Sequence, residues 1–464
     1  MRIQLTILAF LLFKISSAVA QEYDHNKVEL LGHWQQQGLR YSSCWGYEEN
    51  GRQYAIVGGS DGTYYVDITN TDSLKLVDFT DSPIKKATWR EYKTYGKYLY
   101  AVSDDSGPNV MQIVDLSFLP DSVHIVYEGQ DYLRQGHTIF IEGDYLYVGI
   151  RRKPGKTNAM TVFDLKEDPT HPKELRSLED DGIQISQVHD MFVRNDTIYA
   201  SCGYDGLYIF TFKDNKFKAV GSYTDYPFAG YNHSSILSPD GKTLIFTDEV
   251  PGSLPAKSID VSDVSNPTPL DTFYSQSGKA TLHNPFLINS RFFVMASYLD
   301  GMQVFDYSNP KKIKLTGYFD TYYQIDGSAT TGDYDGVWSV YPWLSNGNII
   351  AVDMKNGLYV LDASAAYDTS SIAVKRDVGS VGDVRIYPNP TQGEVRFTLP
   401  SDYRGEATFK MMSTAGQQVN QWKMDVNANQ LVRLELPLVA NGNYILTIAI
   451  KNKKTLSAFI NLTK

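Results

Sequence analysis

Four histidines in the middle of the chain each open a similar stretch of sequence: His137, His189, His233 and His283. From each one an apolar run leads to a polar or glycine turn, and a second apolar run follows. The polar residues beside or shortly after them are Asp190, Asn232, Asp248, Glu249 and Asn284. Imidazoles combined with carboxylates are preferred ligands of zinc, manganese and iron in proteins. These residues are therefore candidates for a ligand site, and the four histidines are candidates for binding a divalent metal ion.

A structural interpretation of the same histidines stays open. Tryptophan takes the equivalent place in three further copies of the pattern, at Trp45, Trp89 and Trp338. Tryptophan can pack and donate a hydrogen bond, but it cannot bind a metal ion. In this interpretation each ring packs against the neighbouring copy and satisfies its polar atoms there. Trp89 and Trp338 nevertheless join the candidates for the ligand site, because they share its position.

The pattern is an internal repeat whose seven copies start at residues 45, 89, 137, 189, 233, 283 and 338. The copies are 44 to 55 residues apart, about the length of one blade of a β-propeller. A second apolar segment follows in each copy, and in four copies a turn pair precedes it: Asp61-Gly62, Asp205-Gly206, Asp300-Gly301 and Asn356-Gly357. Such pairs supply the positive φ angles of tight hairpins. Each copy is predicted to be a four-stranded antiparallel meander, and the whole an all-β, seven-bladed propeller.

The last copy lacks a convincing fourth strand. The stretch "KVELLGHW", at about 27–34, is similar to the outer strand "KIKLTGYF" at 312–319. It is therefore predicted to complete the last blade and so close the ring. In such a blade the first strand lines the central channel, and the second strand returns to the end where the first began. The candidate residues should accordingly meet at one rim of the channel.

The chain divides into four segments by composition. Residues 1–20 have a basic start, an apolar centre and a small-residue end, which predicts a cleaved signal peptide. Residues 21–365 would form the propeller, and the small and polar residues 366–381 a linker. Residues 382–464 alternate apolar strands with glycine and asparagine turns, which predicts a small Ig-like β-sandwich.

Two resemblances to known families accompany this division. The tail carries Tyr387, Pro388, Asn389 and Pro390, and later Gly442 and Tyr444. In this order they resemble the C-terminal sorting domain of the type IX secretion system of Bacteroidetes. The resemblance implies that type IX export machinery is a partner and that the protein is secreted or held at the outer-membrane surface. The propeller, with stretches such as "NHSSILSPDGKTLIFTDE" and "DGMQVFDYSNP", resembles the choice-of-anchor B family of LVIVD-repeat proteins. That resemblance implies a fold and a location outside the cell or at its surface, but no chemical reaction.

The net charge and the absence of certain motifs limit the classes of partner and reaction that the sequence supports. The formal net charge is −10, which argues against nucleic acid and anionic membranes as partners. No segment after residue 20 is long and apolar enough to span a membrane, and none of the strong catalytic motifs occurs. The sequence favours a non-enzymatic secreted or cell-surface propeller that binds a protein or glycan ligand. The alternative is a metal-dependent propeller enzyme, a polysaccharide lyase or hydrolase, that uses the rim histidines.

Overall fold

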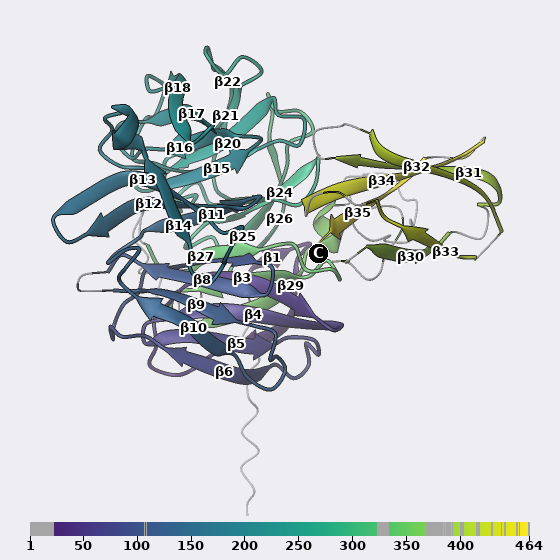
Figure 1. Ribbon diagram of the computed structural model, residues 1–464, viewed down its shortest axis with the longest axis horizontal. Coiled ribbons are helices and arrows are strands. Elements are labelled where there is room, and N and C mark those ends of the chain that lie inside the picture. The colour runs from purple at the N-terminus through teal and green to yellow at the C-terminus, as the bar shows by residue number, and fades with distance from the viewer. Residues whose placement is uncertain are drawn as a thin grey trace, which may run out of the picture.

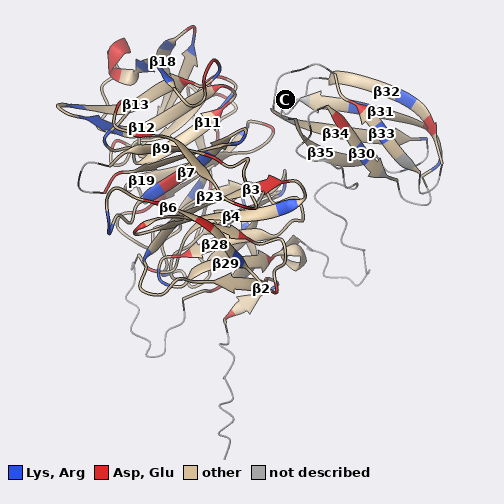
Figure 2. Ribbon diagram, turned by 60° about the horizontal axis from the view of Figure 1, so that its bottom comes forward, with Lys and Arg blue, Asp and Glu red and all other residues tan. Residues whose placement is uncertain are grey.

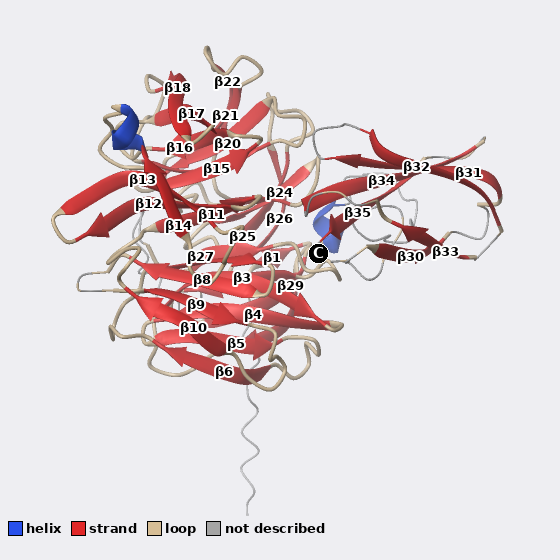
Figure 3. Ribbon diagram, in the orientation of Figure 1, coloured by secondary structure: helices blue, strands red, loops and turns tan. Residues whose placement is uncertain are grey.

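The computed structural model describes residues 23–322 except 106 and 108, residues 334–367, and, with short gaps, residues 384–462. Strands make up most of this part, and two short 3-10 helices are its only helical segments (Figure 3). The strands form seven propeller blades and a separate β-sandwich near the C-terminus (Figure 1). The prediction of a seven-bladed propeller followed by a small β-sandwich is therefore confirmed.

Each blade is an antiparallel sheet whose first strand lies on the inside of the ring and whose fourth lies on the outside. Blade one consists of β3 (Tyr41–Glu49), β4 (Arg52–Gly59), β5 (Gly62–Asp67) and β6 (Lys75–Asp81). Blade two consists of β7 (Arg90–Tyr95), β8 (Tyr98–Ser103), β9 (Met111–Asp115) and β10 (His124–Gly129). Blade three consists of β11 (Thr138–Glu142), β12 (Tyr145–Lys153), β13 (Lys156–Asp164) and β14 (Lys173–Ser177), followed by the 3-10 helix η1 (Leu178–Asp181).

The remaining blades follow the same order. Blade four consists of β15 (Asp190–Arg194), β16 (Thr197–Ser201), β17 (Leu207–Lys213) and β18 (Lys216–Tyr223). Blade five consists of β19 (Asn232–Leu237), β20 (Thr243–Asp248), β21 (Ala256–Asp260) and β22 (Thr268–Phe273). Blade six consists of β23 (Pro285–Leu287), β24 (Phe292–Ala296), β25 (Met302–Asp306) and β26 (Lys314–Phe319). Blade seven consists of β27 (Val337–Tyr341), β28 (Ile349–Asp353), β29 (Gly357–Asp362) and the N-terminal β2 (Glu29–Trp34).

The N-terminal segment ties the ring together. Strand β2 pairs with β29, so the outer edge of blade seven comes from the other end of the propeller segment. Just before it, the short strand β1 (His25–Asn26) pairs with β26 of blade six. From blade seven through blade one to blade six, the inner strands of neighbouring blades contact one another. Contacts between β24 of blade six and β27 of blade seven complete the circle. Closure of this kind covers the outer edge of β29, which would otherwise be left unpaired.

The blades adhere through apolar side chains that alternate along their strands. Between blades two and three, for example, Tyr100 and Ile113 of one blade meet Ile139 and Phe163 of the next, and all four are fully buried. Burying apolar area of this kind contributes about 25 cal/mol per Å². Acidic and basic residues both occur along the strands and loops of the propeller (Figure 2).

Three of the four predicted turn glycines have positive φ. The angles are 89° at Gly206, 70° at Gly301 and 83° at Gly357. At Gly301 a Cβ atom would lie 2.0 Å from the carbonyl oxygen of Phe319, so a larger residue is excluded on two grounds. Gly62 has no positive φ, but a Cβ there would lie 2.2 Å from the carbonyl oxygen of Thr80. At that turn, close approach of the backbone is the reason for glycine.

The C-terminal unit contains two sheets. One pairs β30 (Glu394–Thr398) with β33 (Leu431–Glu435); the other has the order β32 (Gln418–Val426), β31 (Gly405–Ser413), β34 (Gly442–Ile450), β35 (Leu456–Leu462). Phe397, Phe409 and Ile448 are fully buried in the core of this unit. Gly442 opens β34, and the nearby Tyr444 is buried.

Several predicted segments lie outside the described residues. These are the signal peptide 1–20, most of the linker 366–381, and the motif residues Tyr387, Pro388, Asn389 and Pro390. The first linker residues belong to the 3-10 helix η2 (Ser364–Tyr367), which contacts β26 and buries Ala366. Within the described part of the chain, no helix has the length and hydropathy needed to cross a membrane.

Candidate ligand site at the channel mouth

Irregularities at the start of the inner strands aim the candidate side chains. In blade five the pairing of β19 with β20 shifts between Asn232 and Ser234, so His233 is the extra residue of a β-bulge. In blade seven the shift between Val337 and Ser339 gives Trp338 the same position. Bulges bend a strand and redirect a side chain. His137 and His189 directly precede β11 and β15, and His283 lies two residues before β23. We call this end of the ring of inner strands the channel mouth.

The four histidine rings form a continuous row along the channel mouth. The ring centroids are 4.0 Å apart between His137 and His189, 4.4 Å between His189 and His233, and 4.2 Å between His233 and His283. Trp338 continues the row 5.0 Å beyond His283, and Trp89 lies 6.3 Å from Trp338. The structure thus brings together the four histidines and both tryptophans that the sequence placed at one rim.

Three of the four rings are held by a contact at Nδ1. The Nδ1 atom of His283 lies 2.7 Å from the backbone oxygen of Trp338, and that of His189 lies 3.2 Å from the backbone oxygen of His233. The Nδ1 atom of His137 lies 2.7 Å from Oδ2 of Asp104. A carbonyl oxygen can only accept, so Nδ1 of His189 and of His283 must donate. In a neutral imidazole this leaves the lone pair on Nε2.

A carboxylate completes the cluster. Glu249 follows β20, and its Oε2 lies 3.7 Å from Nε2 of His233, while its Oε1 lies 3.7 Å from Nε2 of His283. The hydroxyl of Tyr298 donates to Oε1 at 2.8 Å. Ligand atoms of His189, His233 and Glu249 all lie within 4.8 Å of one another.

Burial decides the protonation of the row. Desolvation, with the neighbouring imidazoles, holds the pKa of His189 and of His233 well below the ordinary value and lowers the pKa of His283 to about 3. For His137 desolvation also works downward, but the Asp104 carboxylate outweighs it and raises the pKa. Burial raises the pKa of Glu249. The row therefore has three neutral imidazoles and, at the His137 end, one imidazole paired with a carboxylate.

The other predicted residues are divided between this cluster and the blades. Asn284 lies at the cluster, where its Nδ2 donates to the backbone oxygen of Trp338 at 3.3 Å. Asp190 accepts a bond from Thr138 at 3.1 Å, and burial raises its pKa to about 6. Asn232 is buried beside Tyr226.

Asp248 faces the interior of blade five instead of the channel mouth. Its carboxylate lies 2.5 Å from Nζ of Lys257 and accepts a bond from the hydroxyl of Tyr226 at 2.8 Å. Successive residues of a strand point to opposite sides, so Asp248 and Glu249 cannot both reach the cluster.

Three tyrosines of the site were not singled out by the sequence reasoning. Tyr298 packs 4.6 Å from His283 and holds Glu249, and Tyr334 donates to the backbone oxygen of Glu249 at 3.1 Å. Tyr231 lies 5.1 Å from His189. Tyr231 directly precedes the Asn232-His233 pair in the sequence, and Tyr298 lies two residues after the second strand of its blade. With 33 tyrosines in the chain, such neighbourhoods were a weak signal.

Trp45 corrects one part of the repeat alignment. It pairs with Ile56 well inside β3 and contacts Tyr341 and Trp343 at centroid distances of 5.0 Å and 5.8 Å. The irregularity of blade one lies earlier, between Tyr41 and Cys44. The tryptophan therefore does not occupy the position of the histidines, and serines 42 and 43 stand there instead.

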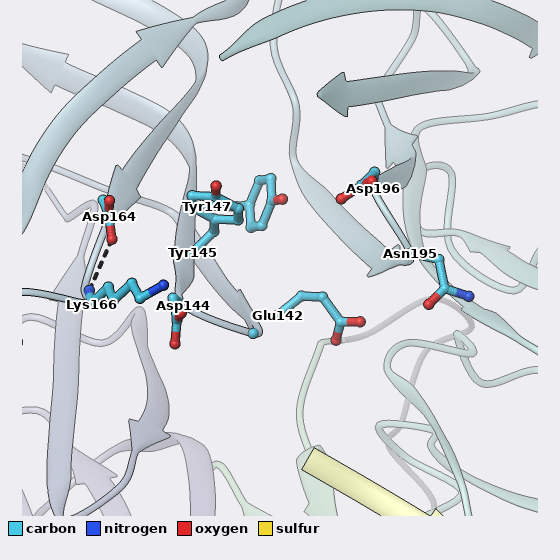
Figure 4. A pocket seen from close by; sticks show the side chains of 9 residues that line it. Glu142, Asp144, Tyr145, Tyr147, Asp164, Lys166, Asn195 and Asp196 are labelled. Carbon is cyan, nitrogen blue, oxygen red and sulfur yellow. Dashed lines mark hydrogen bonds between the residues drawn. The ribbon is translucent and has the colours of Figure 1, made fainter. Parts of the chain in front are cut away.

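A separate pocket of about 270 Å³ lies at the opposite ends of the inner strands, between blades three and four (Figure 4). The side chains drawn there come from strand ends, from β12 and from the adjoining turns; they include Glu142, Asp144, Asp164, Asp196 and Lys166. Lys166 is the one basic residue among the described residues that line it. These carboxylates do not converge on a common point as the side chains at the channel mouth do.

Comparison with known proteins identifies the tail. Residues 385–461 match the family model described as "Secretion system C-terminal sorting domain". The tail is a sorting domain. A tail of this type IX kind marks the protein for secretion or export to the cell surface. No curated protein sequence matches the chain.

Solved structures resemble the propeller in fold. The WD40 β-propeller domain of Doa1 is 12% identical in sequence and has a TM-score of 0.51. The match covers 72% of this chain and 96% of the Doa1 domain. The computationally designed Ika8 protein is 7% identical, covers 71% of this chain and 98% of its own, and has a TM-score of 0.44. At this identity the likeness to the WD40 domain concerns the fold alone.

Proposed function

We propose that this protein is a secreted or cell-surface propeller that binds a carbohydrate at the channel mouth. The observation that carries the proposal is the aromatic surround of the histidine row. Tyr204 is 72% exposed, its ring lies 5.1 Å from Tyr231, and Tyr231 in turn lies 5.1 Å from His189. Rigid aromatic faces beside a few convergent polar groups are typical of sites for small polar ligands.

Polar atoms near these rings suit the hydroxyl groups of a sugar. The Tyr231 hydroxyl accepts a bond from Nε2 of Gln187 at 2.7 Å and so keeps its own hydrogen for a further acceptor. The Glu249 carboxylate can accept, and the His137 ring beside Asp104 can donate. The sorting tail supports the same proposal, since it directs the propeller to a location where polysaccharides are accessible.

Affinity electrophoresis of the full chain from Gln21, in gels that contain a panel of neutral polysaccharides, would test the proposal. We expect at least one polysaccharide to retard the protein. Tyr204→Ala and Tyr231→Ala should each weaken that retardation by about tenfold or more, as truncation of a central aromatic anchor does. Phe118→Ala is the matched control, because Phe118 is also an exposed aromatic but lies on the turn between β9 and β10.

Either of two results would overturn this assignment. One is unchanged retardation of both tyrosine variants; the other is no retardation by any polysaccharide while the chain binds a protein ligand through the same tyrosines.

A metal-dependent enzyme acting on a polysaccharide is a second candidate. It is favoured by the convergence of His189, His233 and Glu249 next to the His137–Asp104 pair. Incubation of the protein with each polysaccharide, in zinc or manganese, should then produce new reducing ends, or unsaturated sugars if the enzyme is a lyase. Binding without either product would leave the protein a carbohydrate-binding propeller.

A further inference from the structure

We propose that His189, His233 and Glu249 bind one transition-metal cation of the class of Zn²⁺, Mn²⁺ or Fe²⁺. The proposal deepens the proposed function and rests on it only in using the same channel mouth. Two imidazoles with one carboxylate are a donor set that these cations accept, and positions remain free for water or a ligand.

The spacing of the donor atoms fits a shared ion. Two ligand atoms that each lie about 2.1 Å from one ion in tetrahedral geometry are about 3.4 Å apart. The Nε2 atom of His233 lies 3.7 Å from Oε2 of Glu249, and a donor atom of His189 lies within 4.8 Å of both residues. A direct hydrogen bond would instead require roughly 2.7–3.2 Å. The separation is too long for a hydrogen bond and close to the span across a metal ion.

His233 provides the strongest single observation. Its side chain is buried, and Nδ1 has no hydrogen-bond partner among the described residues. The other nitrogen, Nε2, faces Glu249 beyond hydrogen-bond distance. A neutral imidazole has one donor and one acceptor, and leaving a buried polar atom unsatisfied costs about 1–3 kcal/mol. Coordination of a cation through Nε2 would supply the interaction that this nitrogen lacks among the described residues.

The contacts behind the donor set are those of a metal site. The backbone oxygen of His233 accepts from Nδ1 of His189 and so fixes that ring with Nε2 unprotonated. The Tyr298 hydroxyl orients the Glu249 carboxylate. Outer contacts of this kind fix the tautomer and direction of metal ligands. His283, whose Nε2 lies 3.7 Å from Oε1 of Glu249, is the nearest further imidazole.

A purely structural role explains less of this arrangement. A histidine that only fills space and bonds to the next blade should have its ring nitrogens satisfied there, as Nδ1 of His283 is. It would not require a half-buried carboxylate opposite the remaining nitrogens. The Nε2 atom of His233 and Oε2 of Glu249 are also 3.7 Å apart, too far for a direct hydrogen bond, and a cation between them explains that arrangement.

The test is the metal content and metal affinity of the full chain from Gln21, purified without chelators. Elemental mass spectrometry should detect about one equivalent of metal per chain. After removal of metal, titration with Zn²⁺ should show one site and raise the melting temperature. Glu249→Gln is the informative variant, because it keeps the size of the side chain and an oxygen for Tyr298. It should weaken zinc binding at least about 100-fold, more than the loss of an outer contact does. His233→Ala and His189→Ala should likewise abolish stoichiometric binding.

Two control variants separate ligand loss from damage to the fold. The double variant Asp248→Asn with Lys257→Met alters the adjacent carboxylate together with its buried partner in the blade, and His124→Ala alters an exposed histidine on blade two. Both should keep the metal. The proposal is refuted if none of the three ions binds the metal-free wild type, or if Glu249→Gln binds zinc as the wild type does.

Polysaccharide retardation of the metal-free wild type keeps the two hypotheses distinguishable. Retardation of a wild type that binds none of the three ions would refute the metal site alone, whereas metal binding without retardation by any polysaccharide would refute the carbohydrate site alone.

Discussion

Tyr298→Phe tests how the channel mouth holds its carboxylate. The change removes one oxygen atom, whose hydrogen bond to Oε1 of Glu249 is 2.8 Å long. The ring, which packs 4.6 Å from His283, would stay in place because phenylalanine has the same shape. The substitution therefore deletes one outer contact of the proposed metal site without opening a cavity.

Its expected effect is on metal affinity. Loss of an outer contact to a metal ligand typically weakens binding 10–100-fold, which corresponds to about 1.4–2.7 kcal/mol. The free energy of unfolding of the metal-free protein should change by only about 1 kcal/mol, the usual net worth of one hydrogen bond. Competition of each protein against a chromophoric zinc chelator measures the first quantity, and thermal melting followed by circular dichroism measures the second.

Tyr334→Phe is the matched control. The Tyr334 hydroxyl donates to the backbone oxygen of Glu249 at 3.1 Å and not to its carboxylate. We expect its zinc affinity to stay within about threefold of the wild type, since the contact does not orient a ligand atom. Equal losses in the two variants, or no loss in Tyr298→Phe, would refute the reasoning that this hydroxyl orients Glu249.

Two further predictions concern stability. Lys257→Met leaves the buried Asp248 without its cation and should destabilise the propeller by about 3–5 kcal/mol, a fall of roughly 4–7 °C in Tm for a domain of this size. Adding Asp248→Asn to this variant should recover much of the lost stability. Lys85→Ala, at an exposed ion pair, is the control and should cost under about 1 kcal/mol. If the double variant recovers no stability, the buried Lys257–Asp248 pair is not the cause of the loss. Burial, with nearby carboxylates, raises the pKa of Asp320 to about 7, so the contribution of this group to stability should fall as pH rises from about 4 to 7. Asp320→Asn should therefore raise Tm by roughly 2–4 °C at pH 8 and have little effect at pH 4, and an equal effect at both values would exclude this cause.

The propeller could be predicted because its signal is repeated. Any single run such as "HTIFIEGDYLYVGI" is an ambiguous pair of strands, but seven runs at a blade-length spacing leave one architecture. The stretch at 27–34 could be placed by its likeness to an outer strand, and β2 is found at the edge of blade seven. The exact start of each inner strand could not be predicted, because local bulges set it. For that reason Trp45 was aligned with residues that it does not match in space.

The candidate site could be predicted in part. Histidines that share a repeat position must lie near one another in a ring, and the four rings do form one row. Which acidic neighbour turns toward them depends on the parity of residues along β20. The bulge at His233 in β19 shifts which residues of β20 lie opposite that strand. The sequence pattern does not show this shift, so it could not separate Asp248 from Glu249. The roles of Tyr298 and Tyr334 depend on contacts between blades, which a pattern within one repeat does not contain.

The site is asymmetric although the ring is nearly symmetric, because the blades carry different residues at the same repeat position. The histidines occupy blades three to six only, while blades seven and two carry Trp338 and Trp89 at the corresponding place. Glu249 comes from blade five and Tyr298 from blade six, so the carboxylate and its donor lie on the histidine side. Tryptophan cannot coordinate a cation, so the polar cluster ends where the two tryptophans begin. Blades of similar architecture around the ring thus give one converging set of imidazole and carboxylate atoms, because the residue at a single repeat position differs from blade to blade.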